Sequence, residues 1–205
     1  MSMQNLTLSE FSEVLSKSDP VPGGGGAAAL CGALAAALGS MVGALTVGKK
    51  KYAAYEESLR ELIRRADEAR LELLALIDGD AEAFAPLAAA YAIPKDAPVR
   101  DEKMEECLRA AASTPMRMVE LCCTVIELQE GFFTMGSRLA VSDAGCGAAL
   151  ALGAMHAASY NVLINTRLMK DRAYADALNS RVNALTEEYA VRAGKVCQGT
   201  RDLLV

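Results

Sequence analysis

Pro20-Val-Pro-Gly-Gly-Gly-Gly26 opens the stretch that decides the fold, and an uncharged segment from Ala27 to Gly48 follows it. Of the 22 residues in that segment, 12 are Ala or Gly. The glycines at 23–26 allow a sharp turn and a close approach of the backbone to another surface. A helix with so few bulky side chains is buried only where neighbouring backbones come very near. The segment is therefore predicted to be the central, enclosed helix of a bundle.

The composition of the whole chain limits its class. The 205 residues are 52% hydrophobic but only 5% aromatic, and the apolar residues are mostly Ala, Leu, Val and Met, which favour helices over sheets. This length suits one domain, which is predicted to span residues 1–205. The net charge of −5 does not favour binding to a nucleic acid, so no nucleic acid is expected as a partner.

The cysteines and the N-terminus favour a cytoplasmic protein. None of the six cysteines has C-x-x-C spacing, and the chain contains one histidine. Neither a disulfide framework nor a zinc site fits this pattern, so we expect buried free thiols in a reducing compartment and no metal. Residues 1–19 are polar and amphipathic, unlike a signal peptide.

A membrane bundle is an alternative, because an uncharged run of this length could span a bilayer. The run contains Gly39-x-x-x-Gly43, a motif of membrane helix pairs, and Lys49–Lys51 follow it as a cytoplasmic flank would. However, only four of its residues are Leu, and a second uncharged stretch carries Asn161 and Asn165, which are unfavourable in lipid. A soluble bundle is the better prediction, with no membrane as a partner.

Hydrophobic periodicity predicts helices along the rest of the chain and no strands. Asp78-Gly79-Asp80 is expected to break or bend one helical pattern, and Pro115 is expected to start or kink another. The predicted fold class is therefore an all-α bundle with two central Ala/Gly-rich helices. These two helices are predicted at residues 27–46 and 144–169. The other predicted helices cover residues 6–18, 55–77, 81–91, 99–112, 115–129 and 176–204.

A turn precedes each of the two Ala/Gly-rich helices, at 23–26 and at 136–143. If the helices pack with both turns at one end of the bundle, two helix N-termini, Asp143 and nearby lysines frame a pocket for an anion. Composition and spacing indicate a helical bundle with an anion-binding end, and they go no further.

Six separated motifs resemble the formiminotransferase-cyclodeaminase C-terminal family in their order and spacing, over essentially the whole chain. One departure is Gly136-Ser137, where the family pattern has Gly-Asn. The motifs are Pro20-Val-Pro-Gly-Gly-Gly-Gly-Ala-Ala-Ala29, Leu45-Thr-Val-Gly-Lys-Lys-Lys-Tyr52, Asp80-Ala-Glu-Ala-Phe84, Pro94-Lys95, Ser142-Asp143-Ala-Gly145 and Asn161-Val-Leu-Ile-Asn165.

The resemblance implies an all-helical homodimer that binds a reduced folate, mono- or polyglutamylated, with no metal or redox cofactor. The family reaction closes 5-formiminotetrahydrofolate to 5,10-methenyltetrahydrofolate with loss of ammonia. A related reaction hydrolyses the methenyl compound to 10-formyltetrahydrofolate. We expect a formiminotetrahydrofolate cyclodeaminase; a methenyltetrahydrofolate cyclohydrolase is the close alternative. A non-catalytic helical oligomerisation module is the alternative from a different class.

Asp143 and Lys49 are the predicted catalytic residues. A buried carboxylate beside the cationic ring of methenyltetrahydrofolate would stabilise the transition state that leads to it, and Asp143 could also relay the proton. The plainer alternative is that Ser142 or Asp143 only caps the following helix. Lys49 would protonate the departing ammonia or hold the glutamate tail of the folate.

The predicted substrate-binding residues lie in the same motifs. Lys49 is roughly 33 Å from Gly26 at 1.5 Å per helical residue, so one pocket cannot easily use both, and we expect a site shared between two subunits. Asn161 and Asn165 are four residues apart and share one helix face. The substrate-binding set is Pro22, Gly23, Gly24, Gly25, Lys50, Tyr52, Ser142, Asn161 and Asn165.

Overall fold

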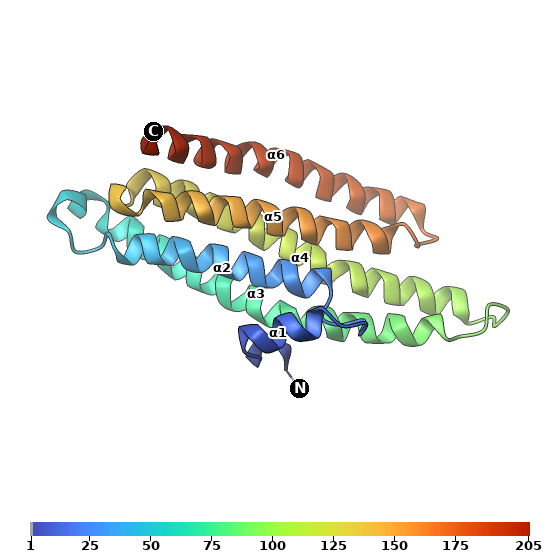
Figure 1. Cartoon of the computed structure of the whole chain (residues 1–205). Coiled ribbons are helices and arrows are strands. Elements are labelled where there is room, and N and C mark those ends of the chain that lie inside the picture. The colour runs from blue at the N-terminus through green and yellow to red at the C-terminus, as the bar shows by residue number, and fades with distance from the viewer. Residues whose placement is uncertain (1) are drawn as a thin grey trace.

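The structure is a computed structural model that describes residues 2–205, and this part of the chain is all α-helical apart from turns and short 3-10 segments. Five long helices lie side by side in an elongated bundle, and a short N-terminal helix packs on one side of it (Figure 1). The helices are α1 (Leu8–Leu15), α2 (Gly24–Ala44), α3 (Glu56–Tyr91), α4 (Arg100–Met135), α5 (Val141–Thr166) and α6 (Arg172–Leu204). The prediction of an all-α bundle is confirmed.

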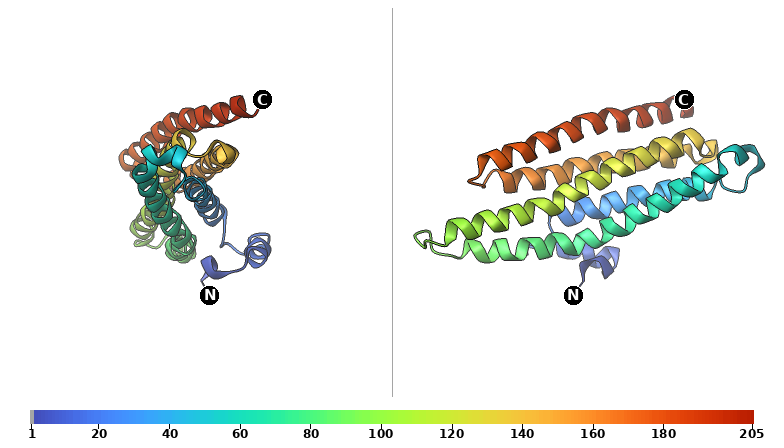
Figure 2. Two further views of the ribbon diagram at one scale, coloured as in Figure 1. Left: turned by 90° about the vertical axis from the view of Figure 1, so that its left-hand side faces the viewer. Right: turned by 180° about the vertical axis from the view of Figure 1, so that it is seen from behind.

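Neither of the two predicted interruptions ends or starts a helix. Helix α3 runs through Asp78-Gly79-Asp80, and α4 runs through Pro115, so that each is a single helix of 36 residues. Glycine or proline inside a helix costs about 1 or 3 kcal/mol, but tertiary packing overrides such local preferences. Here α3 and α4 pack against each other and against α2, which supplies that compensation (Figure 2).

The two Ala/Gly-rich helices begin earlier than the sequence predicts. Helix α2 begins at Gly24 and α5 at Val141, so Gly24–Gly26 form a first helical turn and only Gly23 precedes it as the N-cap. The amide of Ala27 donates to the carbonyl of Gly23 at 3.1 Å, which closes this turn. No side chain caps either helix.

Helices α2 and α5 lie side by side and antiparallel in the bundle. A methyl group on Gly24 of α2 would meet Asn161 near the end of α5, whereas Gly39 and Gly147 both pack against Gln129 of α4. The start of α2 is therefore beside the end of α5. The two helices pack against each other as predicted, but they are not enclosed, because Met41 of α2 and Tyr160 of α5 are exposed. The two turns that precede these helices lie at opposite ends of the bundle.

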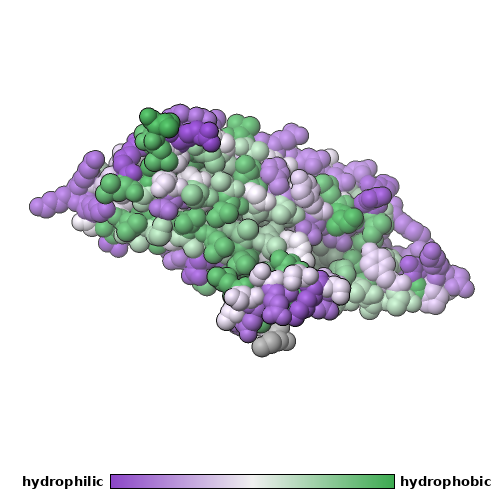
Figure 3. All heavy atoms as spheres, viewed as in Figure 1, coloured by the Kyte–Doolittle hydropathy of each residue, from purple (hydrophilic) through white to green (hydrophobic). Residues whose placement is uncertain are grey.

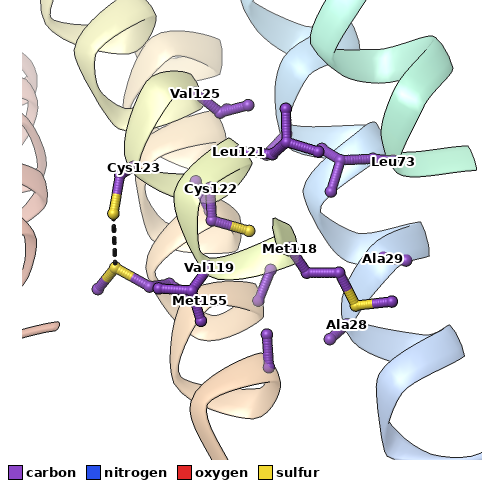
Figure 4. Packing of buried hydrophobic residues seen from close by; sticks show 14 of the residues in the cluster. Ala28, Ala29, Leu73, Met118, Val119, Leu121, Cys122, Cys123, Val125 and Met155 are labelled. Atoms are coloured by element: carbon purple, nitrogen blue, oxygen red, sulfur yellow. Dashed lines mark hydrogen bonds between the residues drawn. The ribbon is translucent and has the colours of Figure 1, made fainter. Parts of the chain in front are cut away.

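The core between these helices is built from small residues and sulfur-containing side chains. Figure 4 shows Ala28 and Ala29 of α2 facing Leu73 of α3 and Met118 of α4, all of them buried. The expectation of free thiols fits residues 107, 122 and 123, which are buried, whereas Cys146 is exposed. Desolvation raises the pKa of the Cys123 thiol to about 12, so this cysteine packs as an inert thiol.

Two segments of the described chain are long and apolar enough to cross a membrane, Gly24–Ala44 and Arg138–Thr166. About half of each is buried inside the bundle, 50% and 44% of their most hydrophobic windows. Both helices pack on each other and on their neighbours, so burial accounts for the apolar residues on the inner side of each helix.

The N-terminal segment is fastened to α3. Thr7 caps α1 in a reciprocal pair with Glu10, and Phe11 is buried against the main core. The side chain of Ser2 and the amide of Met3 both donate to the Asp78 carboxylate at 2.5 Å. This segment leads directly into the loop at 16–23, which forms one wall of a cavity described below.

Candidate active site

A cavity of about 250 Å³ lies where α2 begins and α5 ends. It draws on five parts of the chain: the loop before α2, the start of α2, the middle and end of α3, the middle of α4, and the end of α5 with the residues after it. The lining residues are Pro20, Val21, Gly23, Gly24, Asp80, Phe84, Leu87, Tyr91, Ala111, Asn161, Ile164, Asn165 and Leu168. The cavity is thus mostly apolar with a few polar groups, as small-molecule sites are.

Asp80 is the one carboxylate among the lining residues of the described chain. It is half-buried, and within residues 2–205 no hydrogen bond or ion pair of at most 4.0 Å to its side chain is formed. Burial disfavours the charged form and raises the pKa of the Asp80 carboxyl above its ordinary value. An unpaired carboxyl with a raised pKa in a cavity is a marker of a functional site.

Gly25 makes room for this carboxyl. A Cβ atom built on Gly25 would lie 2.3 Å from Oδ2 of Asp80, so no residue with a side chain fits there without a shift of the acid. The carboxyl consequently sits directly on the first turn of α2, where the backbone N–H groups have no partner within the helix. The glycine run serves a close approach between α2 and α3, and this explains its place in the motif.

Asn161 and Asn165 line the same cavity from α5. The side-chain amide of Asn165 donates to the carbonyls of Asn161 at 2.8 Å and Ala111 at 3.2 Å. Proline has no N–H, so Pro115 leaves the carbonyl of Ala111 without its usual helical donor, and Asn165 takes that place. The proline inside α4 therefore helps to fix an amide of the cavity.

The side-chain oxygens of both asparagines remain as acceptors. The amide nitrogen of Asn161 donates to the carbonyl of Ala157 at 2.9 Å, as that of Asn165 does one turn later to Asn161. Neither Oδ1 atom accepts a hydrogen bond from another group in residues 2–205. With Asp80, the cavity presents three side chains that can accept hydrogen bonds from a ligand.

The remaining predicted site residues lie at the other end of the bundle. The hydroxyl of Tyr52 accepts from the amide of Arg138 at 3.2 Å, and this bond lowers the pKa of Tyr52. Asp143 is half-buried in the first turn of α5 and caps nothing, because the N-cap is Ala140. Lys49, Lys50 and Ser142 are exposed.

The expectation that both turns share one pocket is therefore wrong within one subunit. Gly23, Gly24, Asn161 and Asn165 do line a common cavity, with Gly25 beneath it, whereas none of the residues at the other end contacts it. Pro22 is buried behind the cavity wall, against Gly26. The reason is the antiparallel packing of α2 and α5, which periodicity does not encode. The catalytic roles of Asp143 and Lys49 stay predictions that need a second subunit.

The family profile for formiminotransferase-cyclodeaminase matches residues 7–184 of this chain. The chain belongs to this family. A methenyltetrahydrofolate cyclohydrolase of Methylorubrum extorquens is 37% identical over 188 residues, which are 90% of each protein. The formimidoyltransferase-cyclodeaminase of Rattus norvegicus is 31% identical over 199 residues, 95% of this chain but 37% of that larger protein.

A solved member of the family has the same fold. The crystal structure of formiminotetrahydrofolate cyclodeaminase from Thermotoga maritima superposes with a TM-score of 0.85 at 29% identity, and the match covers 96% of this chain and 98% of that one. The protein is thus a family enzyme that acts on one-carbon derivatives of folate, as the motifs predicted.

Sequence reasoning did not single out Asp80, which the structure places in the cavity. Asp80 begins one of the six family motifs, and that was the available signal. The neighbouring Gly79 made the segment resemble a helix break, and a carboxylate in a break is ordinarily solvated. Only the unbroken α3 shows that Asp80 points under the first turn of α2.

Proposed function

We propose that this enzyme is a formiminotetrahydrofolate cyclodeaminase whose reaction takes place in the cavity at the start of α2. One observation carries the proposal: Asp80 is half-buried, lacks a partner in the described chain, and shares the cavity with the acceptor oxygens of Asn161 and Asn165. A reduced pterin carries ring N–H and amino donors, which match such acceptors. No cofactor besides the folate is needed for this chemistry.

The proposed mechanism needs one group that both accepts and donates a proton. N10 of the folate attacks the carbon of the protonated formimino group, and a tetrahedral carbon bound to N5, N10 and an NH₂ group forms. Asp80 takes the proton from N10 and passes it to the NH₂ nitrogen, which leaves as ammonia when its bond to carbon breaks. Desolvation raises the pKa of this carboxyl, which makes it a better proton acceptor and so suits it to both transfers.

The carboxylate of Asp80 has a second effect in this mechanism. The product ring is a cation shared by N5, the bridging carbon and N10. A negative charge next to it in a mostly apolar cavity stabilises the developing positive charge more than water does. Asp80 thus has the role that the sequence assigned to Asp143.

Methenyltetrahydrofolate cyclohydrolase activity is the second candidate. The 37% identity to the Methylorubrum extorquens cyclohydrolase, over nearly the full length of both chains, favours it. In this reaction water attacks the bridging carbon of the methenyl cation, and Asp80 accepts one proton from the water. The remaining hydroxyl proton then passes to N5 as the C–N5 bond breaks and the formyl C=O forms on N10. The same cavity residues serve either reaction.

We further propose a homodimer that buries an apolar face on α2 and α5. In Figure 3 hydrophobic atoms cover the middle of this face, in the view that has α2 and α5 in front in Figure 1. Ile164 is exposed on this face and also lines the cavity, so a second copy here would extend the cavity wall. The exposed apolar residues of the two helices are Leu34, Met41, Leu45 (directly after α2), Leu150, Tyr160 and Ile164.

This dimer gives the residues at the far end a way to act. In this dimer the two-fold axis would lie in the plane of the apolar face, perpendicular to the helices. The cavity end of each subunit would then lie opposite the Lys49 end of the other subunit. Lys49, Lys50, Tyr52, Ser142 and Asp143 of a second copy would then approach the folate from outside the cavity. We place such a dimer in the cytoplasm, where folate one-carbon carriers and reduced thiols occur together.

A two-substrate assay with purified protein tests the proposed function. Ammonia release from 5-formiminotetrahydrofolate, together with absorbance of the methenyl product, is the expected result. Faster decay of methenyltetrahydrofolate without ammonia release from the formimino compound would establish the second candidate instead. Turnover of neither compound, with no shift of the melting temperature by a reduced folate, would leave a non-catalytic oligomerisation module.

A further inference from the structure

A second cavity adjoins the active-site cavity beyond the end of α3. It also measures about 250 Å³, and Tyr91 and Leu168 line both cavities, so the two cavities are direct neighbours. The second cavity is lined by Tyr91, Arg100, Asp101, Met104, Glu105, Leu108, Leu168 and Lys170. The first cavity thus has amide groups in its wall, the second has charged groups, and the aromatic ring of Tyr91 lies at both.

The two acids of the second cavity are already paired. Asp101 forms an ion pair with Lys170. Glu105 accepts from the backbone amide of Lys170 at 2.7 Å and from Nε of Arg109 at 3.3 Å. Their negative charges are therefore largely offset by groups of the protein itself.

Arg100 is different, because its positive charge meets no carboxylate within 4.0 Å among residues 2–205. Its Nη1 atom donates to the main-chain carbonyls of Tyr91 and Ile93, which fixes the guanidinium at the C-terminal end of α3. The guanidinium is half-buried, and its other N–H groups form no hydrogen bond in the described chain. A fixed, unneutralised guanidinium of this kind is suited to bind a carboxylate with two parallel hydrogen bonds.

We propose that Arg100 binds the α-carboxylate of the first glutamate of the folate, with the aminobenzoyl ring between Tyr91 and Leu168. The inference rests on the proposed function, because it takes the pterin to occupy the chamber beside Asp80. It deepens that function by assigning the tail to the same subunit as the pterin. Lys49, which the sequence offered for the tail, and its neighbour Lys50 lie beyond the far end of α2 and are left for later glutamates of a polyglutamyl chain or for another role.

The test compares two substrates in wild-type protein and Arg100→Gln. One is the folate derivative with a single glutamate, and the other is the corresponding tetrahydropteroate derivative that lacks it. Arg100→Gln should raise KM for the glutamyl compound about ten-fold or more with kcat little changed, because a charge-assisted hydrogen bond is lost. The same variant should leave KM for the truncated compound unchanged.

Two further variants test whether a change in KM comes from altered folding or from a general loss of positive charge rather than from loss of the Arg100 contact. Arg100→Lys keeps the charge and should retain part of the preference for the glutamyl compound, even if Arg100→Gln lowers the melting temperature by uncapping α3. Lys103→Gln removes an exposed lysine one turn along α4 that pairs with Glu106, outside both cavities, and should not change either KM.

The proposal would be overturned if the ratio of KM for the glutamyl compound to KM for the truncated compound were the same in wild type and in Arg100→Gln. It would also be overturned if Lys50→Gln lost the preference for the glutamyl compound while Arg100→Gln kept it. If the wild type turns over neither substrate, the proposed function fails, and direct binding then decides this inference separately. In that case wild type should bind aminobenzoyl-glutamate more tightly than aminobenzoate, and Arg100→Gln should bind both equally. A wild type that does not distinguish the two fragments would rule the subsite out.

Discussion

At the scale of single residues, the burial of Asp80 lowers the stability of the fold and leaves its carboxyl free to react. Its carboxyl is half-buried on the first turn of α2 without a partner in the described chain, and desolvation raises its pKa. Folded proteins ordinarily pair such a group. An unpaired acid in a cavity weakens the fold and leaves the group free to act on a ligand.

Asp80→Asn is expected to stabilise the protein while it removes activity. Because the pKa of Asp80 is higher in the folded than in the unfolded state, the stability linked to its protonation is fully present below its ordinary pKa and is lost as the pH rises through the raised pKa. The asparagine variant does not titrate. Its melting temperature should exceed that of wild type at about pH 8, and the difference should shrink towards about pH 4. A difference that does not depend on pH would contradict this reading of Asp80.

Gly25→Ala is expected to displace the Asp80 carboxyl. The new methyl group would lie 2.3 Å from Oδ2, so the acid or the start of α2 must shift. We expect kcat to fall at least ten-fold and stability to drop by ~1–3 kcal/mol, as for other overpacked sites. Gly194→Ala is the matched control: a methyl group there meets no atom within 4 Å, and the change should add up to ~1 kcal/mol of helix stability. Full activity in Gly25→Ala would show that the position of Asp80 is not critical.

At the scale of helices, small residues let α2, α4 and α5 approach closely around Gln129. This buried side chain donates through Nε2 to the carbonyl of Ala35 at 2.7 Å. Gly39 of α2 and Gly147 of α5 leave the space that it fills. The Ala/Gly-rich composition is thus a requirement of backbone-to-backbone packing.

Gly39→Ala is expected to destabilise the bundle. Its methyl group would lie 2.7 Å from the buried ring of Phe132 and 2.8 Å from Nε2 of Gln129. Overpacking of this kind costs ~1–3 kcal/mol, and thermal unfolding should show a melting temperature lowered by about 2–4 °C for each kcal/mol. An unchanged melting temperature would mean that the three helices are less closely packed than the structure has them.

The sequence was sufficient to predict the helices and the burial of the two Ala/Gly-rich ones, because composition and periodicity encode burial. It was not sufficient to predict that Gly79 and Pro115 lie inside unbroken helices, since packing of α3 and α4 outweighs local propensity there. The direction of α5 relative to α2 depends on connections that no pattern in the chain encodes. Asp143 was therefore assigned to the wrong end of the bundle within one subunit, and Asp80 was overlooked.

At the scale of the whole molecule, the bundle leaves a broad apolar face uncovered. Met41 is 41% exposed on α2 and Tyr160 is 66% exposed on α5, and both belong to the face proposed for dimerisation. Contiguous apolar surface of this kind on a soluble protein marks an interaction site. A second copy on this face is also what Lys49 and Asp143 need in order to contribute.

Met41→Glu is expected to split the dimer, because a charge would be buried in the interface without a partner. Light scattering coupled to size-exclusion chromatography should give the mass of two chains for wild type and of one chain for the variant. Val191→Glu on α6, at an exposed position outside this face, should remain dimeric. A monomeric wild type, active at the same specific rate at all concentrations, would exclude a shared site.

The most direct measurement is kcat with 5-formiminotetrahydrofolate and with methenyltetrahydrofolate for Asp80→Asn beside Asp143→Asn. If Asp80 moves the proton in the cavity at the start of α2, its asparagine variant should lose about 100- to 10,000-fold in kcat on the physiological substrate while folding normally. Asp143→Asn should lose much less. An Asp80→Asn enzyme with wild-type kcat would contradict the assignment of the active site to this cavity, whatever the behaviour of Asp143→Asn.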